Sequence, residues 1–437
     1  MSDTRPHVVI IGAGFGGMYA VRRLRRAPVS VTIVDRGTSH LFQPLLYQCA
    51  TGLLSEGSIA SPVRHLLRRQ RNARVLLGEA SAVDAQARTV TVEGVEGTTN
   101  VLSYDYLIVA VGMRTAYHGC DNAIDHAIGM KTLDDALAIR RQIIGAFEIA
   151  ETLDDPAQRS PWLTFAVAGA GPTGVELAGQ LRDLAQMTLE REFRSIDPAE
   201  ARVLLFHSGD RVLPSFSPAL SGHAQRTLDR IGVETHLGVH VTDVGPATVE
   251  TKVKATGEII TYDARTTLWT AGVEASPFAG ALASALGVTP DRSGRIAVND
   301  DLSVPGHPEV FVVGDVSSYR DLAGVAEVAM QGGRHAAGVI AKAVAGSTER
   351  RAFRYYDLGS AAYIGRRNAV MEAGPLRVWG SLGWIAWGVV HIAFLAGIRN
   401  RLGTVVSWAA TLMTDTRRER AITYGDPRVA RQPYGNN

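Results

Sequence analysis

Glycines recur twice in this chain at the spacing of a phosphate-binding turn. The first run, residues 8–17, places Gly12, Gly14 and Gly17 after a stretch of β-branched residues. Missing side chains at a strand-to-helix turn let a pyrophosphate approach the backbone and the helix N-terminus. The next apolar run ends in Asp35, where a carboxylate can accept hydrogen bonds from an adenosine ribose. These residues predict a bound dinucleotide.

The second glycine run supplies Gly169, Gly171 and Gly174 by the same logic, but its following strand differs. That strand ends in His207, so no carboxylate stands at the ribose position. A neutral His207 could hydrogen-bond a ribose hydroxyl, and a protonated one, helped by Arg211, could pair with the 2′-phosphate of NADP. An exposed histidine without a binding role is the third interpretation, and all three stay open.

Two dinucleotide folds are the simplest arrangement that positions both loops. Each loop is preceded by a strand signal and followed by a helical run and a second strand, which is typical of an α/β Rossmann-like fold. The spacing of these segments suggests that the first fold is interrupted by the second and resumes near residue 285. We expect a split first domain, a second domain and a C-terminal region, at 1–118 with 285–350, 119–284 and 351–437 respectively.

Composition and charge narrow the class of protein. Of 437 residues, 46% are hydrophobic and 20% charged, as in globular proteins of two or three domains. The segment 351–437 has 12 arginines, no lysine and 5 acidic residues, so the basic charge is concentrated at the C-terminal end. Because lysine is rare throughout, we interpret the arginine bias as compositional and expect no nucleic-acid partner.

Cysteine and histidine spacing excludes several chemistries. Cys49 and Cys120 are too far apart for a CxxC motif, and the scattered histidines show no ligand spacing, so no metal site is expected. The N-terminus lacks an apolar run of the signal-peptide type. We therefore expect the body of the protein to stay in the cytoplasm.

Four features together resemble the two-dinucleotide-fold flavoprotein reductases: the two glycine loops, Tyr-Asp-Tyr-Leu-Ile-Val-Ala-Val-Gly at 104–112 and Val-Phe-Val-Val-Gly-Asp at 310–315. Within that superfamily the chain resembles the type II NADH dehydrogenases, the single-subunit NADH:quinone oxidoreductases, over roughly residues 7–425. The segments that carry this resemblance are 40–52, 268–273, 326–331 and the tail rich in tryptophan and arginine.

The resemblance implies FAD in the first fold and a nicotinamide dinucleotide in the second, NADH being expected and NADPH staying open. It implies a hydride transfer from NADH to FAD, followed by electron transfer to a membrane quinone without proton pumping. The implied FAD-binding residues are Gly12, Gly14, Phe15, Gly16, Gly17, Asp35, Arg36, Ala80, Gly112, Asp315 and Ala329. The implied NAD(P)H-binding residues are Gly169, Gly171, Pro172, Thr173, Gly174, His207 and Gly272.

Three further residues are candidates for catalysis. By resemblance Glu176 lies near the nicotinamide and flavin rings, although a Glu in the first turns of a helix can also serve only the helix dipole. The family's Ala-Gln-x-Ala-x-Gln quinone motif has Glu327 in place of its first Gln and keeps Gln331. Gln331 could hydrogen-bond a quinone carbonyl and Glu327 could carry a proton, while ordinary helix-surface roles stay open for both.

Relatives with other chemistry remain as alternatives. Disulfide reductases need a Cys-x4-Cys pair, but Leu54 stands five positions after Cys49. A sulfide:quinone oxidoreductase uses two or three cysteines, and here Cys120 would stand alone, with Cys49 as a small core residue. An NADPH-linked quinone reductase and a catalytically weak flavin-binding regulatory protein also stay open.

The tail predicts attachment to a membrane. Residues 378–398 carry no formal charge, and Trp384, Trp387, His391, Phe394 and Ile398 share one helical stripe. We expect a helix lying in the bilayer surface, with a spanning helix and a buried or dimer-forming helix as alternatives. The flanking arginines are expected at anionic headgroups: Arg399, Arg401, Arg417, Arg418 and Arg420. This predicts a peripheral, monotopic protein on the cytoplasmic face of the cell membrane, and a homodimer stays open.

Overall fold

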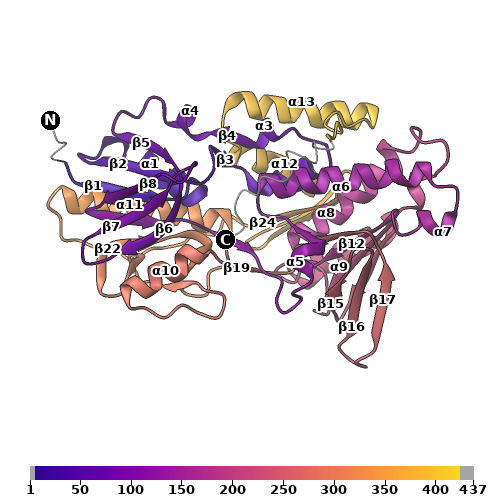
Figure 1. Cartoon of the computed structure of the whole chain (residues 1–437). Coiled ribbons are helices and arrows are strands. Elements are labelled where there is room, and N and C mark those ends of the chain that lie inside the picture. Colours follow the sequence, from indigo (N-terminus) through magenta and orange to yellow (C-terminus); the bar gives the residue numbers. More distant parts are fainter. Residues whose placement is uncertain (1–4, 424–437) are drawn as a thin grey trace. The chain divides into compact units, whose positions relative to one another are not determined.

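The computed structural model describes residues 5–423, which form two compact units. Among the described residues, unit 1 comprises 5–42, 60–116 and 273–359, and unit 2 comprises 43–59, 117–272 and 360–423 (Figure 1). The short segment 43–59 and the C-terminal region thus fold with unit 2, an assignment that the sequence pattern did not suggest. The last part of the expected C-terminal region, 424–437, lies outside the described residues.

Unit 1 is built on a mostly parallel sheet with the strand order β21-β22-β9-β1-β2-β5. Only β21 runs antiparallel to its neighbour. Its strands are β1 (His7–Ile11), β2 (Ser30–Asp35), β5 (Ala73–Leu77), β9 (Tyr106–Val109), β21 (Ser303–Val304) and β22 (His307–Val312). A separate antiparallel sheet contains β6 (Glu79–Asp84), β7 (Thr89–Glu93) and β8 (Thr99–Ser103).

Alternate residues of the parallel strands build two cores, one on each face of the sheet. On one face Ile10 and Ile33 pack with α1 (Phe15–Arg23) and α11 (Ala326–Val344). On the other, Val9 and Ile11 pack with α10 (Pro277–Leu286) and with β7. Because both faces are covered, the strands are nearly continuous apolar runs, as expected of a parallel sheet.

Unit 2 repeats this arrangement with the order β11-β18-β12-β13-β14, in which all strands are parallel. The strands are β11 (Ala127–Gly129), β12 (Thr164–Ala168), β13 (Arg202–His207), β14 (Val233–Leu237) and β18 (Thr266–Trp269). Its helices include α6 (Leu133–Thr152), α8 (Pro172–Asp183) and α9 (Pro218–Ile231). The predicted α/β class with two Rossmann-like folds is confirmed.

Two antiparallel sheets and two terminal helices complete unit 2. One sheet contains β15 (Val239–Val244), β16 (Thr248–Val253) and β17 (Ile259–Asp263), and the other β24 (Ser360–Gly365), β25 (Asn368–Ala373) and β26 (Leu376–Trp379). The chain then forms α12 (Gly380–Phe394) and α13 (Ile398–Thr414). Across residues 5–423, no helix is both long enough and apolar enough to cross a bilayer.

The tail corrects the sequence-based expectation of one helix over residues 378–398. The chain leaves the helical conformation at Leu395, and Gly397 has a φ of +88° before α13 begins. The predicted stripe is also only partly exposed, since Ile398 is exposed and Trp384 and Phe394 are half-buried. Trp387 and His391 are buried, whereas Leu382, Ile385 and Val389 are 71%, 55% and 64% exposed. Since α12 is apolar on all sides, its pattern could not indicate which face is buried.

Helices α1 and α11 approach each other through glycine, which generates a stability prediction. A Cβ built on Gly333 would lie 2.1 Å from the Gly16 carbonyl oxygen, whereas one on Gly338 would meet nothing closer than 3.9 Å. We expect Gly333→Ala to lower the free energy of unfolding by roughly 1–3 kcal/mol through overpacking. Gly338→Ala, the matched control in the same helix, should raise it by about 0.5–1 kcal/mol through helix propensity. Urea unfolding measures both, and equal effects would contradict the close approach.

Candidate functional site: two glycine cradles and an aromatic pocket

The first glycine loop combines tight backbone packing with an open position. Gly12 has a φ of +99°, and a Cβ there would lie 2.3 Å from the Ala110 carbonyl oxygen. A Cβ on Gly17 would lie 1.8 Å from the Gly12 oxygen, so only glycine closes this turn. Gly14, the N-cap of α1, faces open space with nothing within 4 Å. An exposed helix N-terminus beside an unfilled glycine position fits a pyrophosphate.

Asp35 lies at the end of β2, where it is tied to this loop. Its carboxylate accepts hydrogen bonds from the backbone N–H groups of Ala13 at 2.6 Å and Gly37 at 2.7 Å. Burial raises the pKa of the Asp35 carboxyl, and these two hydrogen bonds oppose that effect. Because a carboxylate has about four acceptor sites, two backbone bonds leave capacity for ribose hydroxyls.

The other predicted FAD residues of unit 1 differ in their surroundings. The Phe15 ring packs edge-on against His40, with centroids 5.2 Å apart. Arg36 is exposed, 4.0 Å from Glu79, and Ala80 is buried in β6. The glycines Gly16 and Gly112 differ, since Gly16 packs on Ala110 and Ala329 while Gly112 has a φ of +66° and open space.

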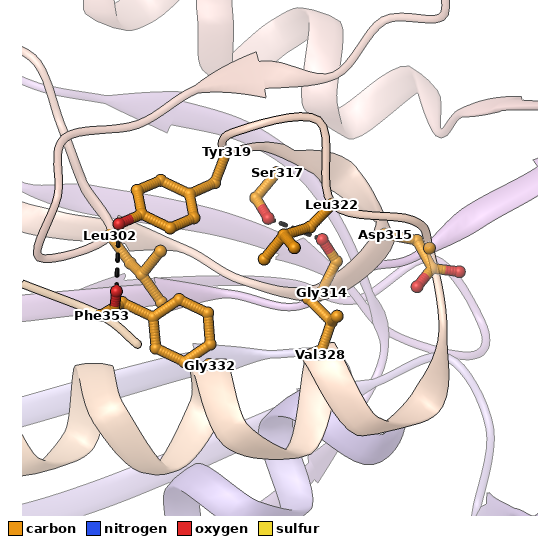
Figure 2. Close-up of a pocket in the computed structure, with 10 residues that line it drawn as sticks. Leu302, Gly314, Asp315, Ser317, Tyr319, Leu322, Val328, Gly332 and Phe353 are labelled. Carbon is orange, nitrogen blue, oxygen red and sulfur yellow. Dashed lines mark hydrogen bonds between the residues drawn. The ribbon is translucent and has the colours of Figure 1, made fainter. Parts of the chain in front are cut away.

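A short turn brings Asp315 to the N-terminal part of α11. Gly314 follows β22 with a φ of +76°, and a Cβ there would lie 3.0 Å from the Ala329 side chain. Figure 2 shows the pocket behind this turn, where Tyr319 donates a hydrogen bond to the Phe353 carbonyl at 3.1 Å. The Asp315 carboxylate points away from those two rings (Figure 2). The turn that carries Asp315 therefore packs on α11 at Ala329.

Glu327 and Gln331 are engaged with the segment that follows α11. Gln331 donates to the Tyr356 carbonyl at 2.8 Å and accepts from the Tyr356 N–H at 3.0 Å. Glu327 accepts from the Tyr355 hydroxyl at 3.3 Å and the Leu358 N–H at 3.2 Å. Burial raises the pKa of the Glu327 carboxyl. Both side chains thus anchor residues 355–358, a role that the sequence did not indicate.

The second glycine loop, in unit 2, reproduces the geometry of the first. Gly169 has a φ of +104°, and a Cβ on Gly174 would lie 1.8 Å from its oxygen, while Gly171 faces open space. The Thr270 hydroxyl donates to the carbonyls of Ala168 at 2.8 Å and Gly169 at 3.0 Å. The predicted residues beside these are exposed or half-buried: Pro172, Thr173 and Gly272. A dinucleotide fits this cradle as well.

His207 ends β13 next to the second loop. Its Nδ1 accepts a hydrogen bond from the Ala170 N–H at 3.4 Å. Burial lowers the pKa of His207, Asp210 acts in the opposite direction, and Lys254 adds a smaller lowering. A histidine held neutral in this way favours hydroxyl recognition over pairing with a 2′-phosphate.

Glu176 is buried on the face of α8 that packs on β24. A Cβ on Gly179 would lie 1.9 Å from the Ile364 oxygen, so helix and strand touch backbone to backbone. The Glu176 carboxylate accepts a hydrogen bond from the Tyr363 N–H at 3.3 Å. Burial raises the pKa of Glu176 well above its usual range, against a smaller effect of that hydrogen bond. Glu176 is therefore not at the exposed N-terminus of α8, where it would serve only the helix dipole.

Further along α8, polar residues line an aromatic pocket that the sequence reasoning missed. The Tyr363 hydroxyl donates to Asp183, and Arg417 donates to the carbonyls of Thr51 at 3.0 Å and Gln180 at 3.2 Å. Aromatic and polar side chains share the walls: Gln48, Gln180, Asp183, Tyr363, Arg366, Trp384, Trp387, Trp408 and Arg417. The spacing of Glu176, Gln180 and Asp183, one helical turn each, was the signal that could have found this polar stripe.

The pocket overturns part of the expected membrane contact. Arg417 is 5% exposed, and Arg420 pairs with Glu192 at 2.5 Å, so neither is available to a headgroup. Arg401 donates to the carbonyls of Leu395 and Ala393, each at 2.8 Å. Arg399 and Arg418 are exposed as predicted.

The two cysteines are free and buried. Burial raises the pKa of the Cys49 thiol to about 11, which suppresses thiolate chemistry. Within residues 5–423, no group of three or more His, Cys, Asp or Glu side chains could hold a metal.

The buried Glu176 generates a prediction with a defined pH dependence. Its raised pKa means that the folded state holds a proton more tightly than the unfolded chain, so this contribution is present below about pH 4.5 and lost as pH rises through the raised pKa. Gln keeps an acceptor for the Tyr363 N–H without a charge. Glu176→Gln should therefore raise the melting temperature at about pH 8.5 and leave it nearly unchanged at about pH 4.5. A melting temperature that shifts equally at both pH values would exclude a buried titrating carboxyl.

The comparisons with known proteins agree with this geometry. Residues 6–333 match the model of the pyridine nucleotide-disulphide oxidoreductase family. The chain is 47% identical to the type II NADH:quinone oxidoreductase NdhA of Mycobacterium tuberculosis over 96% of this chain and 90% of that protein. It is 28% identical to the external NADH-ubiquinone oxidoreductase 2 of Saccharomyces cerevisiae mitochondria, over 92% of this chain and 80% of that protein.

Solved structures share the fold at low identity. NDH2 from Plasmodium falciparum, in complex with NADH, superimposes with a TM-score of 0.88 at 19% identity, covering 95% of this chain and 99% of that one. The sulfide:quinone oxidoreductase of Aquifex aeolicus gives 0.71 at 18% identity, covering 93% and 94%. From the two cradles and the whole-length match, the chain belongs to the type II NADH:quinone oxidoreductase family.

Proposed function

We propose that this protein oxidises NADH and reduces a quinone, with FAD as the carrier of the electrons. The observation that carries the proposal is the pair of glycine cradles, one on each parallel sheet, each with a sterically closed turn and an open central glycine. Two such cradles suit two separate dinucleotides. The proposal is also supported by a relative of 47% identity that is named for NADH and quinone. FAD supplies the two-electron chemistry when bound, because a flavin can accept a hydride and release electrons to an acceptor.

The residues of unit 1 would hold FAD by backbone groups and one acid. The N-terminus of α1 at Gly14 would meet the pyrophosphate, and Asp35 would accept from the ribose. Asp315 and the first turns of α11 at Ala329 would meet the ribityl side of the cofactor. In unit 2, the loop at Gly171 would meet the NADH pyrophosphate, and neutral His207 would meet a ribose hydroxyl.

We place the quinone ring in the aromatic pocket of unit 2 rather than at Gln331 and Glu327. Both of those residues already use their side chains on residues 355–358. Two residues that line the pocket each have a buried donor with no hydrogen-bond partner among the described residues, Trp387 Nε1 and Arg417 Nε. A buried donor without a partner costs about 1–3 kcal/mol, and a quinone carbonyl would satisfy it. The aromatic walls suit a flat ring.

The exposed face of α12 and α13 supports attachment to a membrane without spanning it. Large apolar side chains there are mostly more than half exposed: Leu382, Ile385, Val389, Ile398, Leu402, Val405, Val406 and Met413. Large exposed apolar side chains gathered on neighbouring helices mark interaction with a membrane or a partner. We propose a monotopic protein on the cytoplasmic face, with a lipid-soluble quinone as acceptor. Formation of a homodimer stays a prediction.

Steady-state turnover with NADH and NADPH tests the donor and the place of His207. The wild type should turn over a soluble quinone with NADH at a higher kcat/KM than with NADPH. Replacing His207 with Glu supplies the carboxylate that recognises a ribose diol, so kcat/KM for NADH should rise and that for NADPH should fall, each by roughly 3- to 10-fold. If both values stay unchanged, His207 is not at the ribose.

Trp387→Phe tests the quinone pocket by removing one N–H while keeping an aromatic ring. The KM for quinone should rise about tenfold, the value of one hydrogen bond of about 1.4 kcal/mol. Flavin content and the rate of flavin reduction by NADH should be unaffected. Trp379→Phe, on a tryptophan that is 53% exposed before the same helix, is the matched control and should behave as the wild type. A normal quinone KM in a folded Trp387→Phe protein would remove the ring from this pocket.

A further inference from the structure

Two arginine runs in unit 1 are far apart in the sequence and meet in the structure. They are Arg-Arg-Leu-Arg-Arg at 22–26 and Arg-Arg-Gln-Arg-Asn-Ala-Arg at 68–74, which supply four exposed arginines each. We call these eight side chains the arginine edge. The first run ends α1 and the second leads into β5.

Polar residues inside the second run bind it to the first. Gln70 donates from its side chain to the Val21 carbonyl at 2.7 Å, and Asn72 donates to the carbonyls of Leu24 at 3.0 Å and Val29 at 3.2 Å. Both amide side chains point inward, so the arginines beside them point outward. The basic surface is therefore a built feature of unit 1, held by three side-chain hydrogen bonds.

No carboxylate neutralises the arginine edge within the described residues. Its arginines form no ion pair among residues 5–423, and neither 16–34 nor 60–78 contains an Asp or Glu. At the same edge of the sheet, Asp105 precedes β9 and accepts from the His7 N–H at 2.7 Å. In the strand order, β1 lies between β9 and β2. Asp105 is therefore at least one strand away from the strands β2 and β5, where the two arginine runs meet.

The arginine edge is not part of the FAD cradle. Val31 pairs with Ala73 and Thr32 with Arg74, so the two runs meet at the N-terminal ends of β2 and β5. The glycine loop and Asp35 follow the carboxyl ends of β1 and β2, at the opposite edge of the same sheet. A strand of five or six residues separates the two edges by roughly 17–20 Å. The arginine edge is therefore free of any role in the FAD cradle.

We propose that the arginine edge binds the anionic surface of a lipid bilayer, as an attachment separate from the apolar face of α12 and α13. The inference rests on the proposed function, in which the protein works at a membrane. Basic side chains near an anionic leaflet are attracted to its headgroups individually, and clusters of four to eight are typical of such binding. The two runs contain no aromatic residue on which an unpaired base could stack, which disfavours single-stranded nucleic acid.

The test measures sedimentation of the full-length holoenzyme with vesicles of phosphatidylcholine alone or with about 30% phosphatidylglycerol. One variant replaces Arg25, Arg26, Arg68 and Arg69 with Gln. A charge-matched control replaces four exposed arginines elsewhere, Arg88, Arg141, Arg230 and Arg292. The first variant should bind anionic vesicles roughly 10- to 100-fold more weakly, with a reduced salt dependence, and bind neutral vesicles as the wild type does.

Three results would overturn the proposal. The first is that the edge variant binds anionic vesicles as tightly as the wild type does. The second is that the control variant loses as much anionic binding as the edge variant, which would mean that only net charge matters. Tighter binding of the wild-type edge to duplex DNA than to anionic vesicles, lost in the edge variant, would likewise replace lipid as the ligand. Turnover of a soluble quinone should be unchanged in the edge variant, which shows that it is folded.

A third variant separates this proposal from the proposed membrane attachment through α12. Leu382, Ile385 and Val389 are replaced together with Ser, and binding to neutral vesicles should be lost. If that binding persists while the edge variant still loses anionic binding, attachment through α12 fails and the arginine edge stands. If the apolar variant loses neutral binding and the edge variant is unaffected, the arginine edge fails and α12 stands.

Discussion

In both units, the helix that follows the glycine loop touches its neighbour so closely that no Cβ fits between them. Gly333 of α11 meets the Gly16 oxygen of α1, and Gly179 of α8 meets the Ile364 oxygen of β24. These contacts fix the direction of the two helices whose N-termini form the cradles. Because each cradle binds through backbone groups, small shifts of these helices would move the binding groups themselves. Close backbone approach is thus the constraint from which the dinucleotide geometry follows.

The same constraint in unit 2 places charged and polar groups in an apolar interior. With α8 pressed on β24, Glu176 and Asp183 lie beside Tyr363, and Arg417 supplies the nearby positive charge. Burial raises the pKa of both carboxyls, and for Asp183 the hydrogen bond from Tyr363 and the charge of Arg417 act in the opposite direction. Quinone reduction consumes protons as well as electrons, and carboxyls of raised pKa beside an aromatic pocket are suited to that requirement. The polar residues of α8, Glu176, Gln180 and Asp183, are thus suited to supplying protons to a quinone as well as to holding α8 against β24.

The sequence was sufficient where the signal is local. Glycine spacing and the β-branched runs before it predicted both cradles, and the acid or histidine ending the next strand was correctly placed beside each loop. It failed where burial depends on partners far along the chain. Gln331 and Glu327 bind residues 355–358, and Arg417 turns inward to Thr51 and Gln180. For α12, which is apolar on every side, the covered face is set by packing on distant segments, such as Gly383 on Ala369 of β25 and Trp387 on Trp408, whose ring centroids are 5.1 Å apart.

The most direct test of the central claim is anaerobic stopped-flow mixing of the purified protein with NADH, followed by mixing with a soluble quinone. If one chain carries electrons from NADH through FAD to quinone, the oxidised flavin band should bleach on the first mixing and return on the second. A flavin that stays oxidised with NADH, or one that bleaches but is not reoxidised by quinone, would contradict the proposed reaction.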